Sequence, residues 1–97
     1  MYRVFRVPRG AATQLDLLSK DDLVSRQSIV VREASALGIP GDGSIVLVEG
    51  SEAGVARAEA LLKEASVMLS GAEAEAAYRS FRSQDENAAS GMGLLFG

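Results

Sequence analysis

Hydrophobic and polar positions change their spacing sharply within residues 44–69. Residues 45–48, Ile-Val-Leu-Val, form an unbroken and mostly β-branched run, which is typical of a strand covered on both faces. After Gly50, apolar residues recur at spacings of three and four, at Val55, Ala58, Leu62, Ala65 and Leu69. This repeat predicts an amphipathic helix, and Ser51 is placed to cap its first turn. The segment therefore predicts a strand followed by a helix that packs on the sheet.

The residues before this unit predict two strands and a helix. Residues 2–7, Tyr-Arg-Val-Phe-Arg-Val, are rich in β-branched and aromatic side chains and predict a strand at or near a sheet edge. Residues 14–18 alternate apolar and polar side chains and suit a short second strand, with a turn into the next helix as the alternative. Apolar spacing then predicts a helix from about Lys20 to Leu37, capped by Ser19 and ended by Gly38.

An alanine-rich segment and a small-residue tail follow. Residues 72–83 have helical spacing and predict a third helix. We therefore expect an α+β fold, a two-layer sandwich of order ββαβα with two helices on one face of a small sheet and an added C-terminal helix. Residues 1–83 are expected to form one domain and residues 84–97 a flexible tail. Its apolar cluster, with Leu94, Leu95 and Phe96, is a candidate docking peptide, with packing on its own domain as the alternative.

Composition supports one folded domain. The chain has 97 residues, of which 47% are hydrophobic and 24% charged, a balance typical of a globular chain rather than a disordered one. No apolar run approaches the roughly 18 residues of a membrane span, and the first residues lack the apolar stretch of a signal peptide. We expect a cytoplasmic protein that does not contact the membrane.

The sequence contains neither cysteine nor histidine. Their absence excludes disulfides, zinc sites with thiolate or imidazole ligands, and catalysis by a Ser-His-Asp or Cys-His arrangement. Backbone N–H groups at Gly50 and Ser51 offer a weak anion site of the kind found at many helix N-termini. We predict a protein that is not an enzyme and has no cofactor.

Charge is unevenly distributed along the chain. The net charge is −3, but residues 1–32 carry six basic and three acidic side chains, whereas residues 33–97 carry four basic and ten acidic ones. Arg3, Arg6 and Arg9 are candidate contacts for phosphates or an acidic partner. The alternative is that they are solvated charges that block edge-to-edge aggregation. The negative net charge disfavours a nucleic-acid partner.

Two patterns resemble parts of a type I K-homology domain. Gly38-Ile39-Pro40-Gly41 has the G-x-x-G spacing of that family, and residues 44–69, with Ile-Val-Leu-Val-Glu-Gly-Ser followed by Val-Ala-Arg-Ala, resemble its last strand and helix. The resemblance implies a nucleic-acid-binding module with Gly38 and Gly41 in the backbone clamp. The chain departs from the pattern because Gly41 leads into a strand and the loop lacks a basic residue.

The predicted central strand also suggests self-association. Its alternating side chains place Ile45 and Leu47 on one face and Val46 and Val48 on the other. Because two long helices cover one face only, we expect a second copy to cover Val46 and Val48, with the third helix as the alternative cover. The function we expect is that of a non-enzymatic interaction or accessory domain that forms a homo-oligomer or binds a protein partner. A nucleic-acid-binding module using the N-terminal arginines and a small ligand-binding regulatory domain are the alternatives.

Overall fold

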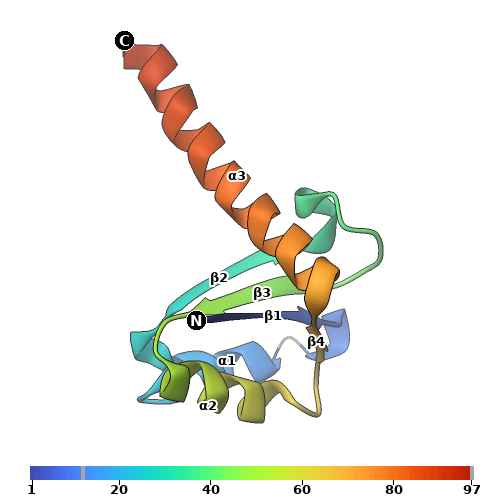
Figure 1. The fold of residues 1–97 in the computed structure, drawn as a ribbon. Helices are drawn as coiled ribbons and strands as arrows, with labels where there is room; N and C mark the ends of the chain where they lie inside the picture. The colour runs from blue at the N-terminus through green and yellow to red at the C-terminus, as the bar shows by residue number, and fades with distance from the viewer. Residues whose placement is uncertain (12, 97) are drawn as a thin grey trace.

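A four-stranded antiparallel sheet forms the centre of the molecule (Figure 1). The computed structural model describes residues 1–11 and 13–96, apart from the side chains of residues 85–96. The strands are β1 (Tyr2–Val7), β2 (Ser28–Glu33), β3 (Ser44–Glu49) and β4 (Val67–Leu69), and they lie in the order β2-β3-β1-β4. Each neighbouring pair is antiparallel.

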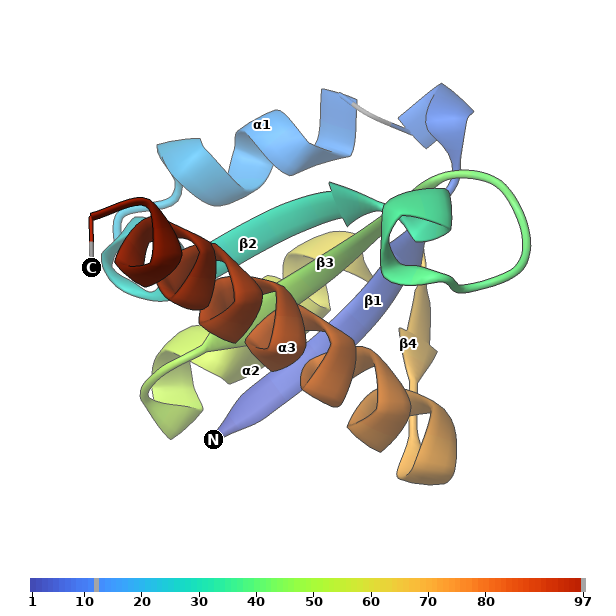
Figure 2. The same cartoon turned by 90° about the horizontal axis from the view of Figure 1, so that it is seen from above.

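Helices cover both faces of this sheet. Helices α1 (Thr13–Lys20) and α2 (Glu52–Leu62) lie on one face, and α3 (Gly71–Phe96) crosses the other and then rises away from it (Figures 1 and 2). Short 3-10 turns are η1 (Arg9–Ala11), η2 (Val24–Arg26) and η3 (Ala34–Leu37). The βαββαβ order of the first 69 residues is that of the ferredoxin-like, or split βαβ, arrangement, to which α3 is added. Within the described chain, none of the helices is long and apolar enough to cross a membrane.

The alternation of side chains along the strands creates a separate core on each face of the sheet. On the face covered by α1 and α2, the buried residues are Phe5, Val7, Leu18, Val24, Val46, Val48, Val55, Ala58 and Leu62. On the α3 face they are Val4, Ala34, Leu37, Ile45, Leu47, Leu69, Ala77 and Phe81. The two central strands, β1 and β3, are therefore covered on both sides, as the unbroken apolar run of β3 predicts.

The α+β prediction is confirmed, with two helices on one face and an added C-terminal helix. Strands β1 and β3 and the start of α2 span the residues expected of them. Strand β1, expected at or near a sheet edge, instead lies inside the sheet and pairs with β3 on one side and β4 on the other. Ser51 caps α2, because its Oγ accepts a hydrogen bond from the Gly54 N–H at 3.1 Å. Gly38 adopts the expected left-handed conformation, with φ 73°, but it ends the turn η3 instead of a long helix.

The elements between β1 and β3 differ from the sequence prediction. Residues 14–18, expected as a strand, belong to α1, where Leu15 and Leu18 lie one turn apart and face the core while Leu17 remains 41% exposed. The helix expected over residues 20–37 is instead η2, β2 and η3. Ser19 is not an N-cap: its hydroxyl donates to the Asp16 carbonyl at 3.0 Å within α1.

The predicted second and third helices have different ends in the structure. Helix α2 ends at Leu62, and residues 67–69 form the edge strand β4, which pairs with β1. The apolar side chains of this segment fit a helical repeat equally well, but pairing with β1 decides the outcome. Helix α3 begins at Gly71 and runs to Phe96, so the backbone expected as a linker after residue 83 is helical. The domain boundary at that position stays a prediction.

Candidate protein-interaction surface

Strand β2 lies at one edge of the sheet (Figure 2). Over the described residues it pairs with β3 alone, in a register that sets Ser28 opposite Glu49 and Val31 opposite Val46. Ile29 and Val30 are half-buried, and Val31 is 38% exposed. A six-residue edge strand with apolar residues at its centre is the feature that proteins usually protect from pairing with other chains.

The backbone of β2 presents alternate residues to β3 and to the outer edge. Ala34 and Gly43 are the next opposed pair after Glu33 and Ser44 at the end of β2. The Ala34 N–H donates to the Gly43 carbonyl at 3.1 Å, so this pair is hydrogen-bonded. Hydrogen-bonded and non-hydrogen-bonded pairs alternate along antiparallel strands. The even-numbered residues of β2 therefore bond to β3, and the N–H and C=O groups of Ile29, Val31 and Glu33 point outward.

Arg32 covers one of these outward groups. Its Nη1 donates to the Val31 carbonyl at 2.8 Å, which agrees with the outward direction of that carbonyl. Both residues are exposed, so the contact is open to water and replaceable by a donor from another strand. An arginine in this position reduces non-specific pairing of β2 with strands of other chains, but it leaves the edge accessible to a specific partner.

The opposite edge, formed by β4, is a poorer template for an added strand. It has three residues, and α3 begins at Gly71, two positions after its end. Val67 is 64% exposed and Met68 40% exposed. Very short edge strands are one way in which proteins avoid edge pairing, so β2 is the stronger candidate surface.

The self-association face predicted at Val46 and Val48 is wrong. Both side chains are fully buried inside one chain, in the core formed with Leu18 of α1 and Val55 of α2. The other face of β3, with Ile45 and Leu47, packs against α3. The third helix, the alternative to a second copy, does cover one face of the sheet. That face carries Ile45 and Leu47, whereas the face expected to need a cover was that of Val46 and Val48. A second copy cannot reach these valines without opening the fold.

The three N-terminal arginines do not gather on one surface. Arg3 and Arg6 occupy positions of opposite parity in β1 and so face opposite sides of the sheet, while Arg9 is exposed in η1. Nη1 of Arg3 donates to the neighbouring Tyr2 carbonyl at 2.9 Å. The geometry therefore builds no continuous basic patch from these residues.

Arg6 holds the loop that precedes β3. Its Nη2 donates to the Pro40 carbonyl at 3.0 Å and its Nη1 to the Asp42 carbonyl at 3.3 Å. The same side chain lines a hollow of about 510 Å³ between this loop, β4 and α3. The Gly38–Gly41 segment thus wraps around an arginine of its own chain, and it joins a 3-10 turn to a strand instead of two helices.

The anion site expected at Gly50 and Ser51 is occupied by Gln27. The Ser51 N–H donates to Gln27 Oε1 at 2.9 Å, and Gln27 Nε2 donates to the Leu23 carbonyl at 3.0 Å. A Cβ at Gly54 would collide with the Gln27 side chain. Residue 27 lies within the helix expected from about Lys20 to Leu37, and that expectation gives no sign of this role. Gln27 ties the start of β2 to the start of α2.

Asp21 organises the turn that leads into β2. Its Oδ1 accepts hydrogen bonds from the Leu23 and Val24 N–H groups, both at 3.1 Å, and its Oδ2 accepts from Arg57 Nε at 2.9 Å. The pKa of this carboxyl is lowered, first by the Val24 backbone hydrogen bond and then by the Arg57 guanidinium. Asp21 therefore holds the backbone at the start of η2 and links it to α2.

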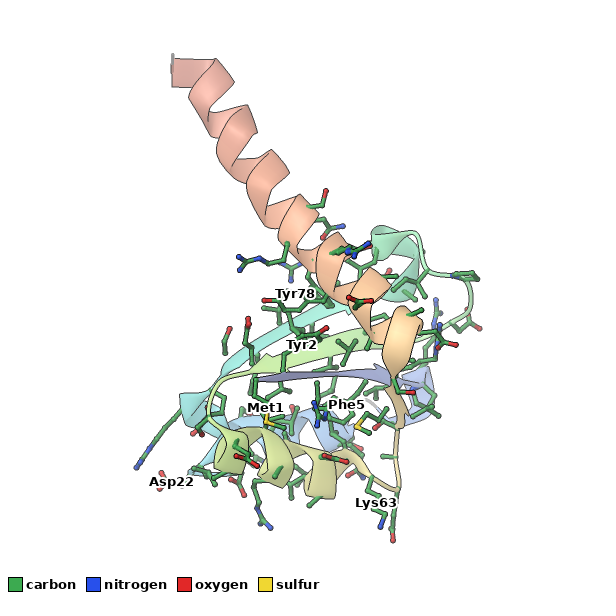
Figure 3. All side chains as sticks on the ribbon, viewed as in Figure 1. Met1, Tyr2, Phe5, Asp22, Lys63 and Tyr78 are labelled. Carbon is green, nitrogen blue, oxygen red and sulfur yellow. The ribbon has the colours of Figure 1, made fainter. Side chains whose placement is uncertain are left out.

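Tyr78 fixes α3 to the sheet. Its hydroxyl donates to Glu49 Oε2 at 2.7 Å, and its ring stacks on Tyr2 with the centroids 4.1 Å apart. Figure 3 shows the two rings between α3 and the strands. The hydrogen bond to the Glu49 carboxylate is the main reason that the pKa of Tyr78 is raised. The contacts of Tyr78 with Glu49 and Tyr2 have a structural role, because they hold α3 against the face of the sheet that carries Ile45 and Leu47.

Comparisons of the chain with protein-family models, with curated proteins and with solved structures found no match. The candidate surface therefore rests on the geometry of this chain alone. The proposed docking tail, Leu94, Leu95 and Phe96, has side chains outside the described residues.

Proposed function

We propose that this protein is a non-enzymatic interaction domain that receives an added strand along the outer edge of β2. The observation that carries the proposal is the outward direction of the N–H and C=O groups of Ile29, Val31 and Glu33 on a six-residue edge strand. Main-chain hydrogen bonds to such an edge supply affinity, and side chains beside it supply specificity.

The side chains of β2 favour an apolar strand as the partner. Ile29 packs with the core under α1 and α2, and Val30 with the core under α3. An added strand extends both faces of the sheet, so apolar residues at its centre gain contact with these side chains and with Val31. β-Branched side chains pack well against their neighbours on the pleated surface of a sheet.

A synthetic peptide with the sequence of residues 27–33, Gln-Ser-Ile-Val-Val-Arg-Glu, tests this function. The peptide has the sequence of β2 preceded by Gln27 and serves as an extended strand with apolar residues at its centre. Titrating it into the intact protein in dilute solution is expected to slow amide hydrogen exchange at Ile29 and Val31, because both N–H groups gain acceptors. A peptide of the same composition in scrambled order is the control.

Val31→Pro is the matched variant for this measurement. The Val31 N–H points outward, so proline at this position removes an edge donor but no hydrogen bond to β3. We expect the variant to keep its circular dichroism spectrum and to lose the response to the peptide. Equal responses to both peptides, or shifts confined to β4 and the helices, would contradict the proposal.

A further inference from the structure

We infer that the strand received by β2 is the β2 of a second copy, paired antiparallel about a two-fold axis at Val30. The inference rests on the proposed function and adds the partner and the register to it. A two-fold contact uses the same surface on both copies, so β2 must be complementary to itself.

The backbone limits the registers available to such a pair. Hydrogen-bonded pairs across the new interface require outward-pointing residues to lie opposite one another. The outward residues of β2 are Ile29, Val31 and Glu33, all at odd positions. An odd-numbered residue must therefore lie opposite an odd-numbered residue of the other copy. In such a register, one residue lies opposite its own equivalent, and the two-fold axis passes between these two. Val30 and Val31 are the central choices.

Side chains select Val30 from these two. With the axis at Val30, Ile29 of each copy lies opposite Val31 of the other, Val30 lies opposite its own equivalent, and Ser28 lies opposite Arg32. With the axis at Val31, the Glu33 carboxylate lies opposite Ile29 and the Arg32 guanidinium opposite Val30. The second register leaves only Val31 opposite an apolar residue, its own equivalent. The first register pairs all three apolar residues with apolar residues and places the charged ones at the ends.

The hydrogen bonds at the edge fit this register. The Ile29 N–H of one copy reaches the Val31 carbonyl of the other, and the Val31 N–H reaches the Ile29 carbonyl. The Val31 carbonyl now accepts from Arg32 of its own chain at 2.8 Å, so the new donor replaces an exposed contact. Because paired residues share a face, the two sheets become continuous, with α1 and α2 of both copies on one side and α3 of both on the other.

Single-cysteine variants measure the register directly, because the chain contains no cysteine. Opposed residues of a non-hydrogen-bonded antiparallel pair have Cα atoms about 4.5 Å apart, which falls within the range of disulfides. Val30→Cys is therefore expected to form a covalent dimer under oxidised glutathione. Val31→Cys lies opposite Ile29 in this register and is expected to cross-link poorly. Ala56→Cys, exposed on α2, reports random collision.

We expect Val30→Cys to cross-link on the order of tenfold faster than Ala56→Cys, because pairing raises the effective concentration of the two thiols. Faster cross-linking of Val31→Cys than of Val30→Cys would overturn the register. Rates at the level of Ala56→Cys for both edge variants, with native circular dichroism spectra, would overturn the second copy as the partner. In that case a positive peptide titration would leave the strand-accepting edge in place, with a different protein as the occupant.

Discussion

Gly43 and Gly38 both have positive φ angles, but only Gly43 lies against another strand. Its φ is 94°, and a Cβ there would lie 2.5 Å from the Val7 carbonyl oxygen and 3.2 Å from the Pro8 Cα. Gly38 has φ 73° and open space around it. Glycine at position 43 is therefore needed both for its backbone conformation and for the space beside β1. Glycine at position 38 is needed for its backbone conformation alone.

Gly43→Ala is expected to destabilise the fold by more than about 2 kcal/mol, since a left-handed conformation costs a residue with a Cβ about 1–2 kcal/mol and the clash with backbone adds to it. Gly38→Ala, the matched control, is expected to cost only about 1 kcal/mol. Urea unfolding of both variants measures the difference. Equal losses in the free energy of unfolding would show that Gly43 lies farther from the Val7 carbonyl of β1 than the clash requires.

At the scale of elements, the turn into β2 depends on the ionised form of Asp21. The folded state lowers the pKa of this carboxyl, so the unfolded chain takes up the proton first as pH falls. The resulting stabilisation is present above the unfolded pKa of about 4 and is lost as pH falls through the lower folded pKa.

Asp21→Asn keeps an acceptor for the Leu23 and Val24 N–H groups but removes the charge that faces Arg57. We expect the melting temperature of the variant to lie below that of the wild type at neutral pH. The difference between the two melting temperatures is expected to become smaller at acid pH. Asp22→Asn is the control, because the Asp22 side chain is 91% exposed in its pair with Arg26. A gap that stays constant across this range would mean that ionisation of Asp21 contributes nothing to stability.

Elements with strong local signals were predictable from sequence, and those decided by pairing were not. The consecutive β-branched residues of β3, and Ser51 before the helical repeat of α2, identify their elements locally. Strand β2 has a similar signal in Ile29, Val30 and Val31, but its flanking apolar residues also fit a helical spacing, and contact with β3 decides the outcome. Likewise, the three residues of β4 gain their conformation from β1.

At the scale of the whole molecule, the candidate surface was not predictable because it depends on strand order. Which strand lies at the edge, and which of its backbone groups point outward, follow from the register of β2 with β3. The sequence led instead to Val46 and Val48, because the path of α3 across the sheet was not evident from its alanine-rich pattern. The need for a partner was inferred from an open sheet face, whereas the structure offers an open sheet edge.

Amide hydrogen exchange of the wild-type protein at low and high concentration shows whether a second copy pairs with the outer edge of β2. The N–H groups of Val30 and Arg32 bond to β3 and are expected to be protected at every concentration. Those of Ile29 and Val31 are expected to exchange rapidly in dilute solution and slowly in concentrated solution, as the second copy supplies their acceptors. Rapid exchange of Ile29 and Val31 in a concentrated sample whose mass is that of a dimer would rule out pairing through β2, as would full protection of both N–H groups in the dilute monomer.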